Sequence, residues 1–337
     1  MKLRVTTLLF SLSLLVATSC RQFYDYFDDV DPKKTKVKEF VAGLQAPLGL
    51  DLDGKNQLWV TEVGTGNNDG KVSVIRPNGV KHVVIEGFPS FIGDEGLAGL
   101  NHLLVKDGML YILHVNGLLY KANIASYRPG QAPIQASSLP TENIGAFVWS
   151  YPFQVPIDES NPYNLTVGPG GNIYITDAGA NAILRRTAAG ALSVIATLPD
   201  LVNPTNVGPP FIDAVPTGIA YNSGKFYVTT LTGFPFLTGK ARLYTLGQSG
   251  NIISYQDGFT TLTDIALDEH NVPVVIEHGQ FGQGFVPNTG RIVATYGQRQ
   301  AEILTGVNQP TDIVISGPKT LYVNSLVDGK IFKVMVK

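Results

Sequence analysis

Short apolar strands separated by turns rich in Gly, Asp and Asn recur along the chain from residue 47 to its end. Each recurrence begins with an apolar strand, passes through a tight turn, and ends in a second strand that usually carries an aromatic residue. Six segments share this outline: PLGLDLDGKNQLWVTE from Pro47, LNHLLVKDGMLYILH from Leu100, PYNLTVGPGGNIYITD from Pro162, PTGIAYNSGKFYVTT from Pro216, LTDIALDEHNVPVVIE from Leu262 and PTDIVISGPKTLYVNS from Pro310. A third strand follows each segment, and usually a fourth. The pattern predicts a series of small antiparallel sheets.

Alignment of the six segments places two sets of residues in a constant register. An inner position, near the start of the first strand, holds Gly49, His102, Asn164, Gly218, Asp264 and Asp312. A second position, at the end of the second strand, holds Glu62, His114, Asp177, Thr230, Glu277 and Ser325. Units of about fifty residues, each an antiparallel meander, are typical of a propeller. The sequence therefore predicts an all-β fold, a six-bladed β-propeller with four-stranded blades.

The last repeat supplies only three strands before the chain ends, so its outer strand must come from elsewhere. The segment KVKEFVAGLQAP, which starts at Lys36, resembles QAEILTGVNQP, the outer strand and turn that precede the last repeat. We therefore expect residues 37–41 to close the last blade and to remove an exposed sheet edge.

An aromatic residue recurs within the second strands. It is Trp59, Tyr111, Tyr174, Tyr227 or Tyr322 in five repeats, and Val274 in the fifth repeat along the chain. We expect these side chains to pack between neighbouring blades as core residues.

The amino terminus is typical of a bacterial lipoprotein signal. Lys2 and Arg4 precede an apolar run at residues 8–16 that is too short to span a bilayer, and small residues lead to Cys20, the only cysteine. The alternative is a chance cysteine at an ordinary cleavage site. The predicted organisation is a signal peptide at residues 1–19, a lipid anchor at Cys20 with a tether over residues 20–34, and the propeller over residues 35–337. The expected location is the bacterial cell envelope, with the N-terminal lipid in a membrane at the periplasmic or outer-membrane face.

Charge and cysteine content narrow the possible partners. The full chain has a net charge of −2, which becomes −4 once Lys2 and Arg4 are removed with the signal. A mildly acidic chain is a poor match for nucleic acid. A single cysteine cannot form a disulfide within the chain, so stability must come from the core.

Both aligned positions carry candidate binding residues. The first strand of a meander starts, and the second ends, at the same face, so we expect both positions near one mouth of the central channel. The candidates for this channel mouth are Glu62, His102, His114, Asn164, Asp177, Asp264, Glu277 and Asp312. Oxygen ligands suit a hard divalent cation such as Ca²⁺, for which the candidates are Glu62, Asn164, Asp264 and Asp312, and the imidazoles would also admit a transition metal. The alternatives are a pocket without metal, and side chains that only cap turns.

Sequence signatures of catalysis are missing: there is no nucleophile elbow, phosphate-binding loop, zinc-binding helix or dinucleotide fingerprint. No catalytic residue can therefore be named, and a binding or scaffold role is favoured over an enzymatic one.

Several segments resemble the ScyD/ScyE family of exported propellers. The resemblance is carried by VPTGIAYNSGKFYVTTLTGFPF at residues 215–236, together with ESNPYNLTV, ITDAGANAILR, GFTTLTDIALD and GFPS elsewhere. It implies an exported six-bladed propeller related to NHL-type and strictosidine-synthase-like propellers, and it brings no catalytic residues with it.

Three functional hypotheses follow from these observations. The first is a cell-envelope propeller that binds a small molecule, a glycan or a peptide. The second is a metal-dependent hydrolase or lactonase of the gluconolactonase-like type that acts at the central channel. The third, which comes only from the gene clusters associated with the family, is an accessory role in making an aromatic secondary metabolite.

Overall fold

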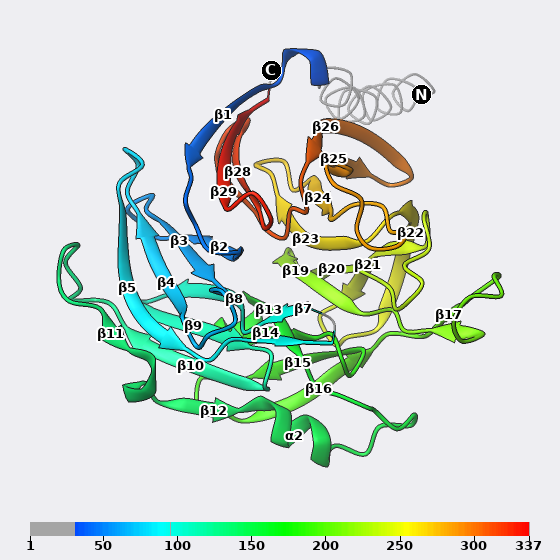
Figure 1. Ribbon diagram of the computed structural model, residues 1–337. Coiled ribbons are helices and arrows are strands. Elements are labelled where there is room, and N and C mark those ends of the chain that lie inside the picture. The colour runs from blue at the N-terminus through cyan, green and yellow to red at the C-terminus, as the bar shows by residue number, and fades with distance from the viewer. Residues whose placement is uncertain (1–30, 95, 337) are drawn as a thin grey trace, which may run out of the picture.

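The computed structural model describes residues 31–94 and 96–336, and within them the chain forms a six-bladed β-propeller. The blades stand around a central axis, and Figure 1 views the molecule along it. The all-β, six-bladed prediction is confirmed. The predicted signal peptide, Cys20 and most of the tether lie outside the described residues.

Each blade is an antiparallel sheet whose first strand lies nearest the axis. Blade 1 contains β2 (Pro47–Leu52), β3 (Leu58–Glu62), β4 (Gly70–Ile75) and β5 (Lys81–Phe88); blade 2 contains β8 (Leu100–Lys106), β9 (Met109–His114), β10 (Leu118–Asn123) and β12 (Thr141–Asn143). Blade 3 contains β13 (Pro162–Val167), β14 (Ile173–Asp177), β15 (Ala182–Arg186) and β16 (Leu192–Thr197); blade 4 contains β19 (Pro216–Asn222), β20 (Lys225–Thr230), β21 (Ala241–Gly247) and β22 (Ile252–Phe259). Blade 5 contains β23 (Leu262–Leu267), β24 (Pro273–Glu277), β25 (Gly290–Tyr296) and β26 (Arg299–Val307); blade 6 contains β27 (Ile313–Gly317), β28 (Thr320–Ser325), β29 (Lys330–Met335) and β1 (Lys36–Val41).

Strand β1 closes the ring as the sequence predicts. It pairs antiparallel with β29, with Lys36 opposite Met335 and Lys38 opposite Lys333. In Figure 1 the blue β1 lies beside the red strands of the last blade. The two ends of the propeller are therefore held in one sheet, which leaves β29 with a partner on each side.

Hydrophobic clusters fill the spaces between consecutive blades. The aligned aromatic residues belong to these clusters, as predicted: Trp59 packs between blades 1 and 2, and Tyr322 between blades 6 and 1. The Tyr174 ring lies 4.5 Å from that of Phe226 in the next blade, measured between centroids. These residues stabilise the contacts between blades.

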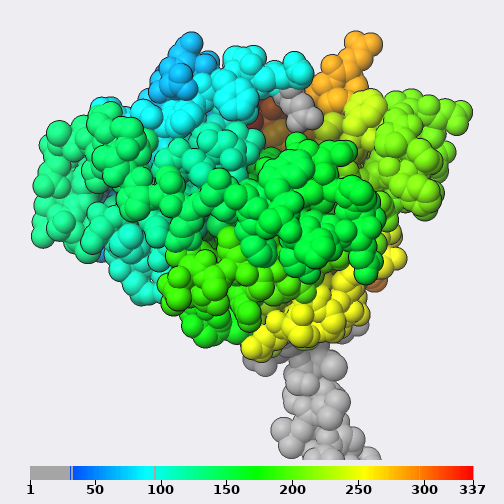
Figure 2. Space-filling model, turned by 90° about the horizontal axis from the view of Figure 1, so that it is seen from below, coloured from blue at the N-terminus to red at the C-terminus, as the bar shows by residue number. Residues whose placement is uncertain are grey.

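Loops and short elements distinguish the two ends of the channel. We call the end where the first strands begin the loop face, and the end where they finish the turn face. The loop face carries the hairpin of β6 (Phe91–Gly93) and β7 (Gly96–Ala98), the hairpin of β17 (Leu201–Val202) and β18 (Phe211–Ile212), and the loop at residues 278–289. In Figure 2 the loop face is uppermost, and its projecting segments include cyan and orange loops.

Short elements between the blade strands make up the rest of the described fold. Strand β11 (Ile134–Gln135) runs parallel to β5 and adds a fifth strand to blade 1. Helix α2 (Ile144–Ser150) is capped by the Asn143 side chain, which accepts a hydrogen bond from the Ala146 amide at 2.7 Å. The 3₁₀ helices are η1 (Pro32–Lys34), η2 (Ala136–Ser138) and η3 (Pro169–Gly171). Among the described residues, no helix has both the length and the apolar character needed to cross a membrane.

Candidate functional site

Four polar residues of the inner position meet in the central channel. The Asn164 side-chain amide donates to Asp264 Oδ1 at 2.8 Å, and His102 Nε2 lies 3.4 Å from Asp312 Oδ2. One nitrogen of His102 and one oxygen each of Asp264 and Asp312 all lie within 4.8 Å of one another. We call His102, Asn164, Asp264 and Asp312 the polar layer.

A β-bulge near the start of the first strand directs the side chains of His102, Asn164 and Asp264 toward the axis. In blades 1 to 5 the register between the first and second strands shifts at this point, so the inner residue belongs to a bulge. A side chain on the second strand accepts from the freed amide in several blades: Thr176 from Asn164 at 3.1 Å, and Asn324 from Asp312 at 2.9 Å. The same bulge in successive blades thus brings residues distant in sequence to one level.

Glycine at two inner positions allows the strands to approach one another closely. A Cβ atom on Gly49 would lie 2.6 Å from the Cα of His102, and one on Gly218 would lie 2.6 Å from the Cα of Asp264. These distances are too short for any side chain, so the glycines permit the spacing that places His102 and Asp264 in the layer.

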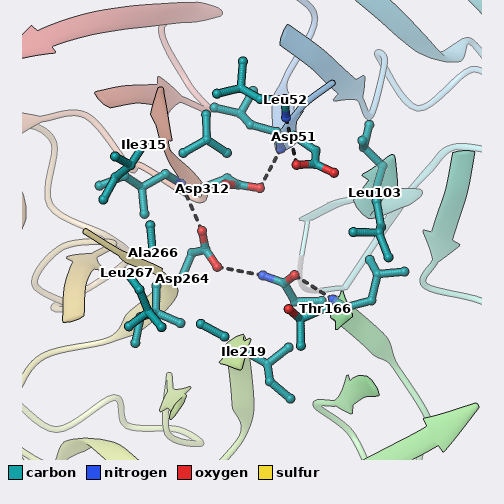
Figure 3. A pocket seen from close by; sticks show the side chains of 18 residues that line it. Asp51, Leu52, Leu103, Thr166, Ile219, Asp264, Ala266, Leu267, Asp312 and Ile315 are labelled. Carbon is teal, nitrogen blue, oxygen red and sulfur yellow. Dashed lines mark hydrogen bonds between the residues drawn. The ribbon is translucent and has the colours of Figure 1, made fainter. Parts of the chain in front are cut away.

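A cavity of about 390 Å³ extends from the polar layer along the axis. Its lining runs from Asp264 and Asp312 to Leu52, Leu267 and Ile315 near the ends of the first strands. No loop of the loop face is among the described residues that line it. The cavity therefore lies on the turn-face side of the layer, although we expected the site at the mouth where the first strands begin. Figure 3 shows Asp264 and Asp312 directed into this space, with aliphatic side chains around them.

Burial determines the charge state of the layer. Desolvation raises the pKa of Asp264 to about 6, and desolvation together with the Asp264 charge raises the pKa of Asp312 well above its usual value. Desolvation lowers the pKa of His102 to about 4, so this imidazole is neutral at pH 7. The layer thus holds two carboxyl groups that interact with each other beside a neutral imidazole, and no lysine or arginine forms an ion pair with them among the described residues.

Hydrogen-bond acceptors converge beside His102. Its Nδ1 atom lies 2.9 Å from the Tyr163 carbonyl oxygen, so Nδ1 carries the proton and donates it. The lone pair of Nε2 then faces both the Thr311 carbonyl oxygen and Asp312 Oδ2, each at 3.4 Å. Acceptors in this arrangement require a shared proton or a bound cation between them.

The donor set of the layer partly fits the predicted metal site. His102, Asp264 and Asp312 can offer one nitrogen and two carboxylate oxygens to a common point, which suits a transition metal better than Ca²⁺. The oxygen of Asn164 already accepts from the Leu165 amide at 2.6 Å, so Asn164 donates to Asp264 as it stands. Glu62 is not part of this group, because its contacts are with Ser73 Oγ at 2.6 Å and the Gln45 amide at 2.9 Å.

Candidates at the second aligned position hold the chain segments that lead into their own blades. Glu277 accepts from the Thr260 amide at 3.1 Å and forms a bidentate ion pair with Arg291 at 2.6 and 2.8 Å. Asp177 accepts from the Asn161 amide at 2.8 Å, and His114 Nε2 lies 2.9 Å from the Pro89 carbonyl oxygen. None of the four residues Glu62, His114, Asp177 and Glu277 lines the cavity. This position acts as a structural clamp, because its side chains pair with backbone groups of the chain that leads into the first strand.

Two residues next to the layer were not among the candidates. Asp51 lines the cavity and accepts from the Leu52 and Val105 amides, and desolvation raises its pKa to about 6. The Tyr163 ring packs against His102 with 4.6 Å between centroids. Burial, followed by the charges of Asp264 and Asp312, raises the pKa of Tyr163.

A signal for Asp51 was present in the sequence. Two residues after the inner position the other repeats have Leu104, Thr166, Ala220, Ala266 and Val314, so a carboxylate there is exceptional. Tyr163 offers a weaker signal, as an aromatic residue where three other repeats have threonine.

Comparison with known proteins identifies the fold without assigning a family. No protein-family model matches the chain, and no curated protein matches its sequence. Among solved structures, a gluconolactonase from Xanthomonas campestris aligns with a TM-score of 0.58 at 11% identity, covering 90% of each chain. Virginiamycin B lyase from Staphylococcus aureus aligns with a TM-score of 0.54 at 16% identity, covering 90% of this chain and 100% of the lyase. The PQQ-bound aldose sugar dehydrogenase from Streptomyces coelicolor aligns with a TM-score of 0.58 at 14% identity, covering 90% of this chain and 99% of the dehydrogenase. These proteins carry out different chemistry on one fold, so the likeness establishes the propeller and leaves the reaction open.

Proposed function

We propose that this protein is a binding propeller whose central cavity takes up a small molecule. The observation that carries the proposal is the cavity itself: its inner end is formed by Asp264, Asp312 and Asn164, and most of the other side chains that line it are aliphatic. An apolar cavity with a few convergent polar groups is the usual form of a small-molecule site. Its volume of about 390 Å³ favours a small molecule over the glycan and peptide alternatives.

A screen for stabilising compounds tests this proposal. A small molecule that binds the folded state raises the melting temperature, so a library can be screened by thermal shift. The control variant is Thr166→Trp, which places a large side chain in the cavity from the wall of β13. We expect hits to lose their effect in this variant, and hits that stabilise both proteins equally would contradict a site in the cavity.

A metal-dependent hydrolase is the second candidate function. The observation that favours it is the convergence of His102, Asp264 and Asp312 within 4.8 Å, and the neighbours in fold include the gluconolactonase from Xanthomonas campestris. A bound divalent cation would polarise a carbonyl group and activate water. His102 would contribute the Nε2 lone pair, with its ring held by the Tyr163 carbonyl, and the two aspartates would bind through oxygens that face the cavity.

Metal analysis separates the two candidates. Protein purified without chelator should be analysed for bound metal, and its melting temperature compared with and without EDTA. Stoichiometric metal and a fall in melting temperature on chelation would support the hydrolase. No metal and no shift would remove it and leave the binding propeller.

Membership of the ScyD/ScyE family and export as a lipoprotein are part of the same proposal. Their support is the set of resembling segments, the positively charged and apolar amino terminus, and the small residues before Cys20. Mass spectrometry of the amino-terminal peptide tests the anchor: a diacylglyceryl group on Cys20 is expected, and an unmodified Cys20 inside a longer peptide would contradict it. A role in aromatic metabolite synthesis is supported only by the family resemblance and would be tested from the genes beside this one.

A further inference from the structure

The charges in the cavity lack a counter-charge from the protein. Three carboxyl groups, those of Asp51, Asp264 and Asp312, line it, and none of its described lining residues is a lysine, arginine or histidine. Their hydrogen-bond donors are mainly backbone amides: Leu52 and Val105 donate to Asp51, Ile313 to Asp264 at 3.0 Å, and Leu50 to Asp312 at 2.6 Å. Amides satisfy lone pairs and leave the negative charge uncompensated, so the cavity attracts a cation.

The rest of the lining defines the other part of the ligand. From the level of Asp51 toward the turn face the walls include Leu52, Leu104, Ala266, Leu267 and Ile315. These side chains offer no hydrogen bonds and favour an apolar group. A ligand that satisfies both regions has its charge at the inner end and a short apolar portion toward the turn face.

We propose that the ligand is a small amphiphilic cation, an ammonium group carrying a short apolar chain that enters from the turn face. This inference rests on the proposed function and names the ligand class of the same cavity. The ammonium group binds at the carboxyl groups of Asp51, Asp264 and Asp312, and its chain lies against the aliphatic wall. An ammonium ion provides several hydrogen-bond donors and a positive charge. It would therefore satisfy acceptors of the polar layer that have no cationic partner.

Matched probes of equal chain length test the ligand class. Binding of hexylammonium and of 1-hexanol to the chelator-treated protein can be compared by titration calorimetry, with Mn²⁺ as a third probe. We expect hexylammonium to bind at least tenfold more tightly than 1-hexanol. Equal affinity for the two, or tight binding of Mn²⁺ that prevents hexylammonium from binding, would overturn the assignment.

Two aspartate variants locate the effect. Asp51→Asn keeps the side chain's shape and removes a cavity charge, together with one of the two hydrogen bonds from the Leu52 and Val105 amides, and it should weaken hexylammonium binding at least tenfold. The matched control is Asp107→Asn, which removes a charge from a side chain that is 81% exposed in the turn between β8 and β9, and it should leave the affinity unchanged. Equal effects of the two variants would indicate general surface electrostatics and overturn the proposal.

The Thr166→Trp variant distinguishes an error in the ligand class from an error in the location of the binding site. If neutral molecules bind and Thr166→Trp abolishes their binding, the cavity is a ligand site and the cation assignment is wrong. If Thr166→Trp leaves all binding unchanged, the cavity is not the site and both proposals are wrong.

Discussion

Replacing Asp312 with Asn tests the electrostatics of the polar layer. Asp312 and Asp264 are both buried, and their carboxyl groups are close enough to hydrogen-bond to each other. An amide at position 312 can donate to Asp264 and still accept from the Leu50 amide, which donates to Asp312 at 2.6 Å. The variant therefore removes one charge while retaining the shape and hydrogen bonds of the layer.

The expected gain in stability depends on pH, and the raised pKa values give its sign. A carboxyl group with a raised pKa in the folded state stabilises the protein at low pH, and that contribution is lost as the pH rises through the folded-state pKa. For Asp264 the pKa rises from 3.8 to about 6, so carrying its charge at pH 8 costs about 3 kcal/mol of folding free energy. Part of the free energy needed to ionise both carboxyl groups is the repulsion between the Asp312 and Asp264 charges. We expect the free energy of unfolding of Asp312→Asn, measured relative to wild type, to be ~1–3 kcal/mol higher at pH 8 than at pH 5.

Urea unfolding at both pH values measures this difference. Fluorescence from the two tryptophans can follow the transition, and chelator-treated protein removes any contribution from metal. Asp107→Asn is the control, since its exposed charge should show no pH-dependent effect. A stability difference between Asp312→Asn and wild type that is the same at both pH values would refute the reasoning. A loss at pH 8 would mean that the ionised pair is already compensated.

The remaining predictions concern the parts of the fold that position the site. Gly49→Ala should destabilise the protein by on the order of 2 kcal/mol in urea unfolding, because its Cβ would overlap the His102 backbone; wild-type stability would contradict the close approach. Glu277→Ala should lower the unfolding free energy by about 2 kcal/mol, because it removes the bidentate partner of Arg291 and the acceptor of the Thr260 amide, and should not change ligand affinity in calorimetry; a change in affinity would return Glu277 to the site. Deletion of residues 31–41 should expose the edge of β29 and produce oligomers in size-exclusion chromatography, and a stable monomer would show that closure by β1 is dispensable.

The fold was predictable because its repeat is regular. The constant spacing between the two aligned positions predicted six meanders, and the similarity of the segments before the first and last repeats predicted that β1 would close blade 6. The aligned aromatic residues were assigned to the core for a physical reason, since a large apolar ring at one position of every blade must pack against the next blade.

The site was only partly predictable because alignment gives register without side-chain direction. The bulge in the first strands turns His102, Asn164 and Asp264 toward the axis, while the second position, where Glu277 and Asp177 stand, faces backbone groups of its own blade. Equal register therefore does not determine which side chains line the cavity. Asp51 stands two residues after the inner position, so it belongs to neither aligned set, and only its unusual charge at that position marks it.

Methyl NMR tests most directly whether small molecules bind in the cavity. Ile219 and Ile315 line the cavity, whereas Ile85 lies in the core between blades 1 and 2 and Ile92 is exposed on the loop face. Titration with hexylammonium, or with a compound found by the thermal-shift screen, should shift the methyl signals of Ile219 and Ile315 and leave those of Ile85 and Ile92 in place. Shifts at Ile92 without shifts at the cavity residues would contradict the account.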